Sequence, residues 1–539
     1  MKIMLASLTD KIKEYKRTLF DSKRYYIIFL ALTVISILSM ISINNVIHPK
    51  FELLTFFVVC IMGIFCISYA LRHNNDEELY KTAFVIILCF GLVCALILPI
   101  CSVSDEKEHI VRSEITSQGV IFPHWNGEEK GVTRLYNITD GNIEDAYNEG
   151  VGYLTIHGIK VLVSERNSNI FNSKHAYDKI DYTPEIYDSA FEQNPFYGYL
   201  PQAIGILIAK LLDLNLIWVL WLARICNLLC FAALASLAVK KTPYLKIPLI
   251  VIACLPITIY QASSASIDSM IMGLGLLAIS YFIYMYKSEK NSLENKEIII
   301  FTIICLLLGL CKLTYLAFIF LLFFIPSENF KDKKNLRLIL LCFAVTVAIG
   351  LSWSKYASPT LVHSWRSHWQ PVNSTLQINY ILNHPEYSLD LLNKFLNEVI
   401  FKFDNQFFNF FNSKSVPLWG YYNDKYYLIN ILINIFLAIV LIANPNNTKF
   451  NLKTRLGSAG IIVLIYFGTC IVQLLSYTTV GGFNLGMNFR YFIPTLALIP
   501  IVFQINYGDF KNKEFDKYAL VMSIGFLAAL ILAFATKYY

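Results

Sequence analysis

The stretch Val103–Gly119 reads VSDEKEHIVRSEITSQG and follows the apolar run Lys81–Cys101. That run is long enough to cross a bilayer, so the stretch would stand where the chain leaves the membrane. Its first turns carry six ionisable side chains, which are Asp105, Glu106, Lys107, Glu108, His109 and Arg112. Charge this dense at a membrane exit indicates either a solvated surface or a functional site.

A helical conformation would bring four of these side chains to one face, because they recur at positions i, i+3, i+4 and i+7. The four are Asp105, Glu108, His109 and Arg112. Two carboxylates, an imidazole and a guanidinium on one face could handle protons and phosphates. The alternative is a solvated amphipathic helix lying on the headgroups, because charge runs usually mark solvated faces.

The composition excludes a soluble domain. Of the 539 residues, 56% are hydrophobic and only 15% are charged, which is far more apolar than a soluble chain of this length. The net charge is +7, but the lysines and arginines cluster in short segments between apolar runs, where they set orientation. We therefore expect the lipid bilayer as partner and no nucleic acid. The cysteines lie in or at the end of apolar runs, so no disulfide is expected in the polar loops.

The apolar runs predict an all-α polytopic integral membrane protein with about 13 transmembrane helices. We place these spans at Tyr25–Val46, Leu53–Leu71, Thr82–Cys101, Leu216–Val239, Ile247–Tyr260, Asp268–Tyr286, Ile298–Leu310, Leu313–Ile325, Leu336–Lys355, Tyr426–Ala443, Leu456–Tyr477, Tyr491–Ile505 and Tyr518–Ala535. Two of them, Ile298–Leu310 and Leu313–Ile325, are short for spans of roughly 20 residues. They could instead form one long helix kinked around Cys311–Thr314.

Basic residues set the expected orientation. The basic segment Met1–Arg24 precedes the first span, so the positive-inside rule places the N-terminus in the cytoplasm. Alternation then puts five further basic loops on the same side, beginning at Lys240, Lys287, Lys331, Lys449 and Lys511. We expect a multi-pass protein of the cell membrane with an extracytoplasmic C-terminus at Tyr539.

Two large loops of mixed α/β character should face outward. The predicted organisation is residues 1–101 for the N-terminal tail and three spans, 102–214 for the first loop, 215–355 for spans four to nine, 356–425 for the second loop and 426–539 for spans ten to thirteen. Within the first loop, Ile159–Ser164 has a strand pattern. Tyr199–Leu212 is too short and too polar to cross, and is typical of an interfacial helix.

Four charged residues lie in or beside the predicted spans, where an unpartnered charge is costly. They are Arg224, Asp268, Lys312 and Arg490, all toward the outer side by the topology above. Arginine suits bidentate contact with phosphate, so these residues could form a pocket for an anionic headgroup. The structural alternative is that Arg224 pairs with Asp268 to hold helices together and that Lys312 extends toward the interface.

Nucleotide, hydrolase and metal motifs are absent from the sequence. There is no Walker A loop, no GxGxxG after a strand and no GxSxG elbow. His363, His368 and His384 are too scattered for a metal site. We therefore expect no cofactor. The sequence assigns no metal ligands, and it leaves open whether the protein uses a divalent metal.

Several segments carry a resemblance to a known family. DEKEHIVR, which begins at Asp105, resembles the DEPAHFxR signature of a bacterial polytopic family named domain of unknown function 2142, with Lys107 and Glu108 in place of Pro-Ala. GMNFRYFIP, which includes Arg490 and Tyr491, is similar to the family's GxQGRYFxP. Shorter matches are PFYGYLPQAIG, ARICN, LPITIYQASSASID, GLCKLTY and ILNHPEY, so that the resemblance covers about Ser102–Ile505.

That family is similar in layout to GT-C glycosyltransferases, which take a sugar from a polyprenyl-phosphate carrier. The resemblance implies that Asp105 acts as general base, with Glu106 as its neighbour or as a metal or acceptor contact. His109 and Arg112 would orient the base or hold the glycan acceptor. Arg490 with Tyr491, and Arg224 with Asp268, would line the site of the polyprenyl-phosphate-linked sugar.

Two other functions stay open. A transporter or flippase for a lipid-linked oligosaccharide would use the same charges along a path, and inverted repeats with broken helices would favour it. A non-catalytic component of an envelope-polysaccharide assembly complex is the third candidate. The enzyme hypothesis requires that Asp105 and Arg490 meet on one side of the membrane.

Overall fold

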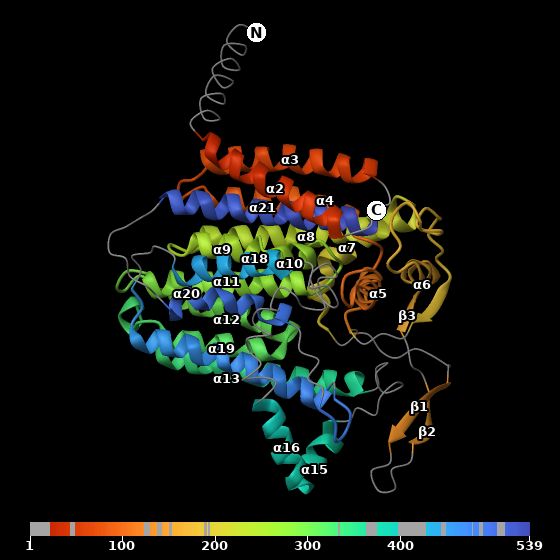
Figure 1. The fold of residues 1–539 in the computed structure, drawn as a ribbon. Coiled ribbons are helices and arrows are strands. Elements are labelled where there is room, and N and C mark those ends of the chain that lie inside the picture. Colours follow the sequence, from red (N-terminus) through yellow and green to blue (C-terminus); the bar gives the residue numbers. More distant parts are fainter. Residues whose placement is uncertain are drawn as a thin grey trace.

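The computed structural model shows a bundle of long helices with smaller helices and two strand pairs beyond one of its ends (Figure 1). The structure describes residues 22–43, 49–122, 130–136, 143–149, 153–187, 191, 194–332, 335–362, 374–396, 427–443, 449–476, 478–483, 489–503 and 513–539.

Eight helices in the described part of the chain are long and apolar enough to cross a bilayer. Each follows from an apolar run of about 20 residues or more. They are α2 (Lys23–Ile43), α3 (Pro49–Arg72), α4 (Leu79–Ile97), α8 (Leu216–Lys241), α11 (Asp268–Lys287), α13 (Asn335–Val362), α19 (Leu452–Ser476) and α21 (Lys513–Tyr538). The protein is therefore a mostly helical, polytopic membrane protein, as its composition predicts.

The other five predicted spans correspond to shorter or interrupted segments, so the predicted total of 13 is not confirmed. With η denoting a 3-10 helix, they are α9 (Lys246–Ala253) with α10 (Pro256–Ala262), α12 (Asn295–Cys311), η2 (Leu313–Phe324), α18 (Tyr427–Ile442), and η6 (Phe489–Leu498) with α20 (Ile499–Val502). Pro256 explains one interruption, because proline lacks an N–H and suits the first turn of a helix. It therefore divides the run Ile247–Tyr260 into α9 and α10.

Lys312 separates α12 from η2. Its backbone is extended, with φ −153° and ψ 107°, and the two helices pack against each other. Gly309 of α12 permits this packing, since a Cβ there would lie 2.1 Å from a methyl carbon of Leu316. The alternative of one long helix kinked around Cys311–Thr314 is therefore wrong.

Helix α8 lies at the centre of the bundle, packed against α4, α11 and α7 (Leu200–Leu211). Gly205 of α7 rests on the α8 backbone, where a Cβ would lie 2.2 Å from the carbonyl oxygen of Leu222. Only glycine allows so close an approach. The predicted helix at Tyr199–Leu212 is thus present as α7, and its position at the membrane interface stays a prediction.

The segment between α4 and α8 mixes helices and strands, as predicted. It contains α5 (Glu106–Ser117), α6 (His157–Ser164) and η1 (Phe196–Tyr199), the antiparallel pair β1 (Lys130–Tyr136) with β2 (Ile143–Glu149), and the antiparallel pair β3 (Tyr153–Ile156) with β4 (Pro184–Tyr187). The predicted strand at Ile159–Ser164 is wrong, because that segment is helix α6. Its buried residues Ile159 and Leu162 are three positions apart, which is helical spacing.

Two helices stand between α13 and α18 in the described part of the second loop, α15 (Ser374–Asn383) and α16 (Pro385–Phe395). The Tyr387 hydroxyl donates to the Gly482 carbonyl at 2.5 Å, and the Gly481 N–H donates to Gln377 Oε1 at 2.9 Å. These bonds fasten the pair to the segment after α19. The described residues of this loop are helical, which differs from the predicted mixed character; residues 363–373, with His363 and His368, and 397–425 lie outside the description.

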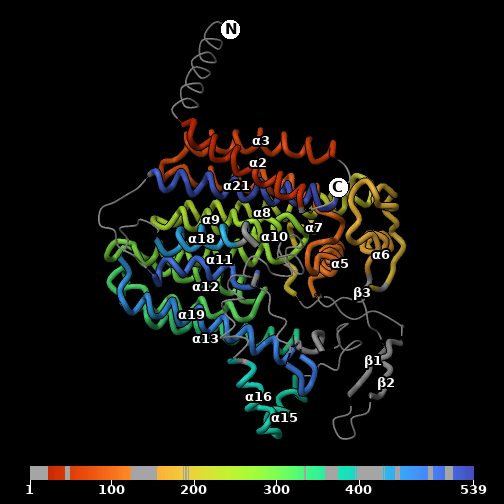
Figure 2. The backbone as a smooth tube through the Cα atoms, viewed as in Figure 1, coloured from red at the N-terminus to blue at the C-terminus, as the bar shows by residue number. Residues whose placement is uncertain are grey.

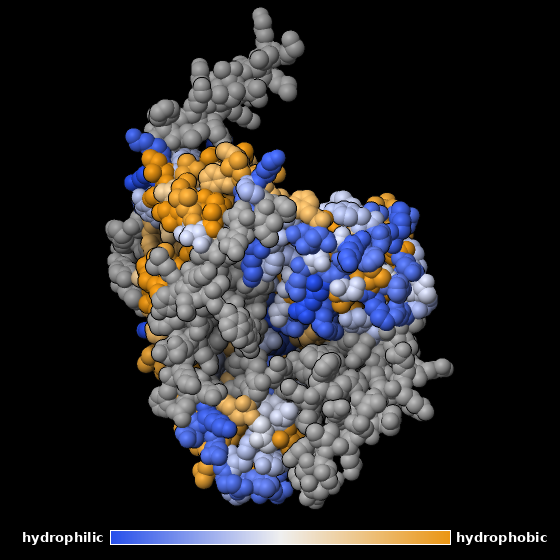
Figure 3. Space-filling view, turned by 45° about the vertical axis from the view of Figure 1, so that its right-hand side comes forward, coloured by the Kyte–Doolittle hydropathy of each residue, from blue (hydrophilic) through white to orange (hydrophobic). Residues whose placement is uncertain are grey.

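Four of the five predicted basic loops, those beginning at Lys240, Lys287, Lys331 and Lys449, gather at one end of the bundle, and Lys511 lies outside the described residues. Lys246 donates to the Asp76 carbonyl, Lys287 donates to the Lys449 carbonyl, and Lys331 pairs with Glu294. Asp76 precedes α4 and the charged helix α5 follows it, so these loops lie at the end of the bundle away from α5 (Figure 2). Hydrophilic side chains cover the α5 and α6 region, and hydrophobic ones cover α2 and α3 (Figure 3).

Candidate functional site

Asp105 stands between the end of α4 and the start of α5. Its backbone has φ 64° and ψ 6°, the left-handed conformation, which costs a non-glycine residue on the order of 1–3 kcal/mol. The side chain is 39% exposed. A strained backbone that presents a half-exposed carboxylate is a feature of functional sites.

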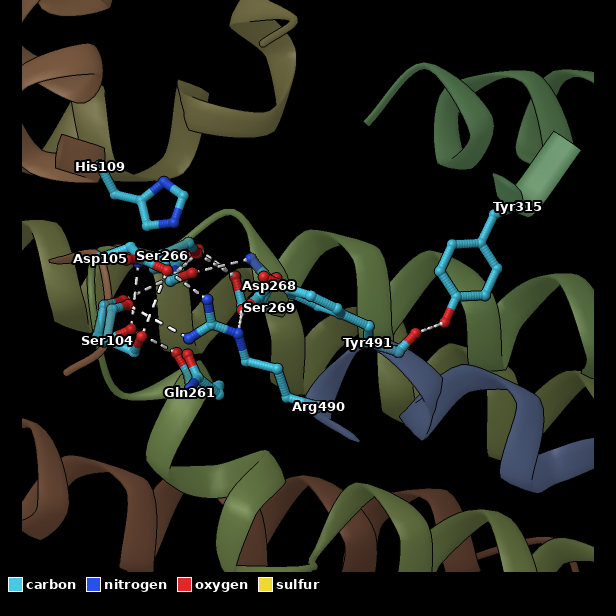
Figure 4. A network of polar contacts seen from close by, with 12 residues as sticks. Ser104, Asp105, His109, Gln261, Ser266, Asp268, Ser269, Tyr315, Arg490 and Tyr491 are labelled. Carbon is cyan, nitrogen blue, oxygen red and sulfur yellow. Dashed lines mark hydrogen bonds and ion pairs between the residues drawn. The ribbon is translucent and has the colours of Figure 1, made fainter. Parts of the chain in front are cut away.

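Arg490, at the start of η6, links this carboxylate to a second one. Its Nη2 donates to Asp105 Oδ2 at 2.6 Å, and its Nε lies 3.0 Å from Asp268 Oδ2 (Figure 4). The guanidinium is only 3% exposed, and the Asp268 side chain is 13% exposed. The expected contact between Asp105 and Arg490 is confirmed, across 385 positions of sequence.

A polar loop between α10 and α11 holds Asp268 in place. Asn227 of α8 donates to the carbonyls of Ser264 and Ser266 at 2.7 and 2.9 Å. The Ser266 hydroxyl in turn accepts the Asp268 N–H at 3.1 Å. The loop is fully buried, so each of these backbone groups needs a partner inside the protein. The bonds therefore fix the first residue of α11 against Arg490.

Tyr491 brings a second cation to the site. The Lys312 ammonium lies 3.0 Å from the centroid of the Tyr491 ring, a cation–π contact. The Tyr315 hydroxyl donates to the Tyr491 carbonyl, which fixes the backbone next to Arg490. Asp105, Asp268, Arg490 and Lys312 thus place two carboxylates and two cations in one region. This balance of charge lets an added anion compete for either cation.

His109, one turn into α5, is buried above the ion pairs (Figure 4). Its Nδ1 lies 2.8 Å from the Tyr199 hydroxyl, which also accepts a hydrogen bond from Asn194 at 3.0 Å. Burial lowers the pKa of His109 to about 4, against the opposing effect of Asp268 and Asp105. The imidazole is therefore neutral at pH 7.

Arg224 and Glu106 form a separate ion pair with no exposure on either side chain. Both carboxylate oxygens of Glu106 accept from Arg224, at 2.8 and 2.7 Å. The other guanidinium N–H groups donate to the carbonyls of Ala95, Leu98 and Pro99. The structural alternative that paired Arg224 with Asp268 is therefore wrong in its partner. The Arg224 guanidinium has no N–H left for a phosphate in this conformation.

Arg112 is also fully buried, and it donates hydrogen bonds to backbone carbonyls. It donates to Thr116 Oγ1 at 2.7 Å and to the carbonyls of Ile121 and Asn194 at 3.1 and 3.3 Å. These bonds hold the chain after α5 against the segment that precedes η1. The predicted common face of Asp105, Glu108, His109 and Arg112 is divided in the structure, since only Asp105 and His109 lie at the Arg490 site. Glu108 pairs with its neighbour Lys107.

Potential metal ligands do not cluster in the described part of the chain. No group of three or more histidine, cysteine, aspartate or glutamate side chains there could hold an ion.

Residues that the sequence analysis did not identify do contribute to the site. Tyr315 and Tyr199 are uncharged, and nothing in a local sequence pattern distinguishes them from packing residues.

The protein is thus a polytopic membrane protein in which a site of buried ion pairs lies beyond the third span. The chain belongs to the family described as predicted membrane protein (DUF2142), whose model matches residues 88–499. No curated protein and no solved structure matches the chain. The family description states no activity, so the function has to be argued from the site.

Three helices outside the matched region pack together. The helices α2 and α3 precede residue 88, and both pack against α21, which follows residue 499. The Tyr25 hydroxyl of α2 donates to Glu514 of α21 at 2.6 Å, and a Cβ on Gly525 would touch Leu32 at 3.0 Å. These helices form a layer along one side of the bundle (Figure 1). The site lies within the matched region.

Proposed function

We propose that the protein is a membrane glycosyltransferase of the GT-C type. It transfers a sugar from a polyprenyl-phosphate carrier to a cell-envelope glycan on the extracytoplasmic face of the cell membrane. The single observation that carries this proposal is the contact between the half-exposed Asp105 carboxylate and the buried Arg490 guanidinium. A proton acceptor next to a phosphate-binding group is what glycosyl transfer from a phosphate ester needs.

The reaction divides between these two side chains. An acceptor hydroxyl attacks the anomeric carbon of the carrier-linked sugar, and its proton passes to the Asp105 carboxylate. The bond from the anomeric carbon to the phosphate oxygen breaks as the new glycosidic bond forms. The departing phosphate gains negative charge, which the Arg490 guanidinium stabilises through hydrogen bonds. Because Arg490 Nη2 donates to Asp105, phosphate binding competes for this nitrogen and releases the base.

The other predicted site residues take supporting roles in this proposal. Asp268 holds the Nε side of Arg490, and Tyr491 carries the Lys312 ammonium. His109 is a neutral hydrogen-bonding group that orients the acceptor. The buried contacts of Glu106, Arg224 and Arg112 favour a scaffold role over the acceptor, metal or phosphate contacts expected from the sequence.

Orientation enters the proposal through the basic loops. They gather at the end of the bundle away from α5, and basic loops favour the cytoplasm. The N-terminus would then be cytoplasmic, the C-terminus extracytoplasmic, and Asp105 on the outer side, where lipid-linked sugars meet envelope glycan.

A second candidate function is transport of a lipid-linked oligosaccharide. It is favoured by the interrupted segments α9–α10 and η6–α20, since transporters often build their sites from broken helices. The last turn of α10 and the first of η6 border the same ion pairs. The enzyme is the stronger candidate because the charged residues gather at one end of the bundle and do not follow a path through it.

Asp105→Asn is the experiment that tests the proposal. The substitution removes the proton acceptor and keeps the shape, so sugar transfer should fall by about 10²–10⁴-fold. Envelope glycan from cells that carry the variant should lack one substituent, while its lipid-linked donor accumulates. Asp178→Asn is the matched control, because Asp178 is an exposed carboxylate of the same loop and pairs with His175.

The same experiment separates the candidate functions. Normal expression with unchanged glycan would remove Asp105 from the mechanism. Accumulation of a complete oligosaccharide on its lipid carrier inside the cell would favour the transporter. Loss of the whole polymer, with no defined precursor, would favour a non-catalytic component of an assembly complex.

A further inference from the structure

Gln261 is a buried side chain at the site that no part of the mechanism above uses. It lies in the last turn of α10 and has no exposed surface. Neither its Oε1 nor its Nε2 has a hydrogen-bond partner among the described residues. In Figure 4 it lies on the opposite side of the Arg490 guanidinium from His109, and α10 packs against η6.

An unpartnered buried amide is costly, because it loses its bonds to water and gains none in return. Two neighbouring amides do use their N–H groups, although Gln202 Oε1 also has no partner among the described residues. Gln202 of α7 donates to the carbonyls of Ala265 and Ser266, and Asn227 donates to two carbonyls of the same loop. Both of those side chains hold the buried loop together. The Gln261 side chain makes no such bond to the described residues.

We propose that Gln261 binds the phosphate of a lipid phosphate ester together with Arg490. Its Nε2–H groups donate to a phosphate oxygen, while the Arg490 Nη2 exchanges Asp105 for the same phosphate. The carboxylates of Asp105 and Asp268 flank Arg490, and their negative charge opposes a bound phosphate. A phosphate therefore needs a further hydrogen-bond donor that is not itself attached to a negative group. An amide supplies that donor without adding a net charge. This inference rests on the proposed function and adds a phosphate-binding residue to it.

The inference predicts opposite changes in two measurements on the purified full-length chain. Without ligand, Gln261→Leu should raise the apparent Tm by roughly 1–4 °C, because it removes an unpartnered polar group. Binding of decaprenyl monophosphate should weaken by about 10- to 100-fold, the value of one hydrogen bond to a charged group. A purely structural glutamine would give a lower Tm. Gln202→Leu is the matched control and should lower the Tm.

Two further probes identify the part of the ligand that is bound. Decaprenol has the lipid chain without phosphate, and inorganic phosphate has the anion without the chain. Binding of decaprenyl monophosphate alone supports a lipid phosphate ester. Equal binding of inorganic phosphate would overturn the lipid part of the inference, and equal binding of decaprenol would overturn the phosphate part.

The outcomes separate this inference from the proposed function. If the wild type binds decaprenyl monophosphate and Arg490→Met abolishes binding, unchanged affinity in Gln261→Leu overturns only the role of Gln261. If the wild type does not bind the lipid phosphate at all, both fail. Gln261→Met is a second, unbranched variant of similar length. Failure of both variants to fold would show that the amide is structural and would overturn the inference.

Discussion

Two buried arginines contact the charged segment that follows α4, and they differ in how exposed their partner carboxylates are. Arg224 contacts both oxygens of Glu106 and three backbone carbonyls, with no exposure on either side chain of the pair. Arg490 contacts Asp105 through one nitrogen, and that carboxylate is 39% exposed. The first pair is closed to any ligand, whereas the second opens on one side to solvent.

The difference separates scaffold from site. A buried ion pair contributes most when its remaining donors are all satisfied, as those of Arg224 are. Around Arg490 the structure keeps costly features, namely the left-handed backbone of Asp105 and the amide of Gln261, which has no partner among the described residues. Neither feature adds stability, so both are better explained by a ligand. Adjacent acidic residues, Asp105 and Glu106, thus serve different purposes.

The largest expected effect on stability comes from breaking the closed pair. Arg224→Met leaves the Glu106 carboxylate buried without a counter-charge and three carbonyls without donors. Such a change costs about 3–5 kcal/mol. Unfolding of the purified protein by titration with a denaturing detergent would measure this loss. Arg490→Met should cost less, because the Asp105 carboxylate keeps access to water.

A double variant sharpens the comparison between the two arginines. Arg224→Met combined with Glu106→Met removes both charges, and such replacements of buried pairs are often neutral or stabilising. The double variant should therefore recover most of the stability that Arg224→Met loses. A smaller loss of stability in Arg224→Met than in Arg490→Met would reverse the assignment of scaffold and site.

The sequence reveals the long spans and the location of the charges for a physical reason. A span needs about 20 apolar residues, so α4, α8 and α21 can be read directly from composition. Charged residues in apolar surroundings need partners, and this requirement singles out Arg490 and Asp105 from the sequence alone. Both lie next to span ends on one side of the membrane, so their contact could be expected.

The partners of each charge could not be read from the sequence. Asp268 pairs with Arg490 and not with Arg224, whose partner is Glu106 of α5. That choice depends on how α4, α5 and α8 pack, which no local pattern encodes. Gln261 gives no signal either, since a glutamine near the end of an apolar run is common in structural roles. Its importance comes from the absence of a bond, which only the structure reveals.

His109 offers a test through pH, with an effect of intermediate size. Its pKa in the folded protein is about 4, below its value of about 6.5 in an unfolded chain. The unfolded state therefore binds a proton first as the pH falls, and stability is lost between pH 6.5 and 4. The loss approaches about 3 kcal/mol at the acidic end. His109→Asn should flatten this part of the curve of Tm against pH.

The control for this test is His175→Asn. His175 is half exposed and pairs with the exposed Asp178, so its removal should leave the pH curve nearly unchanged. A curve that is the same in His109→Asn and the wild type would show that His109 is not buried as a neutral group. The site above Arg490 would then be open to water, in contrast to the closed pair of Arg224.

The smallest expected effect comes from Tyr315→Phe, which removes one hydroxyl next to the site. That hydroxyl donates to the Tyr491 carbonyl, and the Tyr315 ring is fully buried. Stability should fall by about 0.5–1.5 kcal/mol, the usual value of one hydrogen bond. Binding of lipid phosphate should weaken as well, because the Tyr491 backbone sets the position of Arg490. If affinity is unchanged while stability falls, η6 places Arg490 without help from Tyr315, and the open site is as rigidly built as the closed pair.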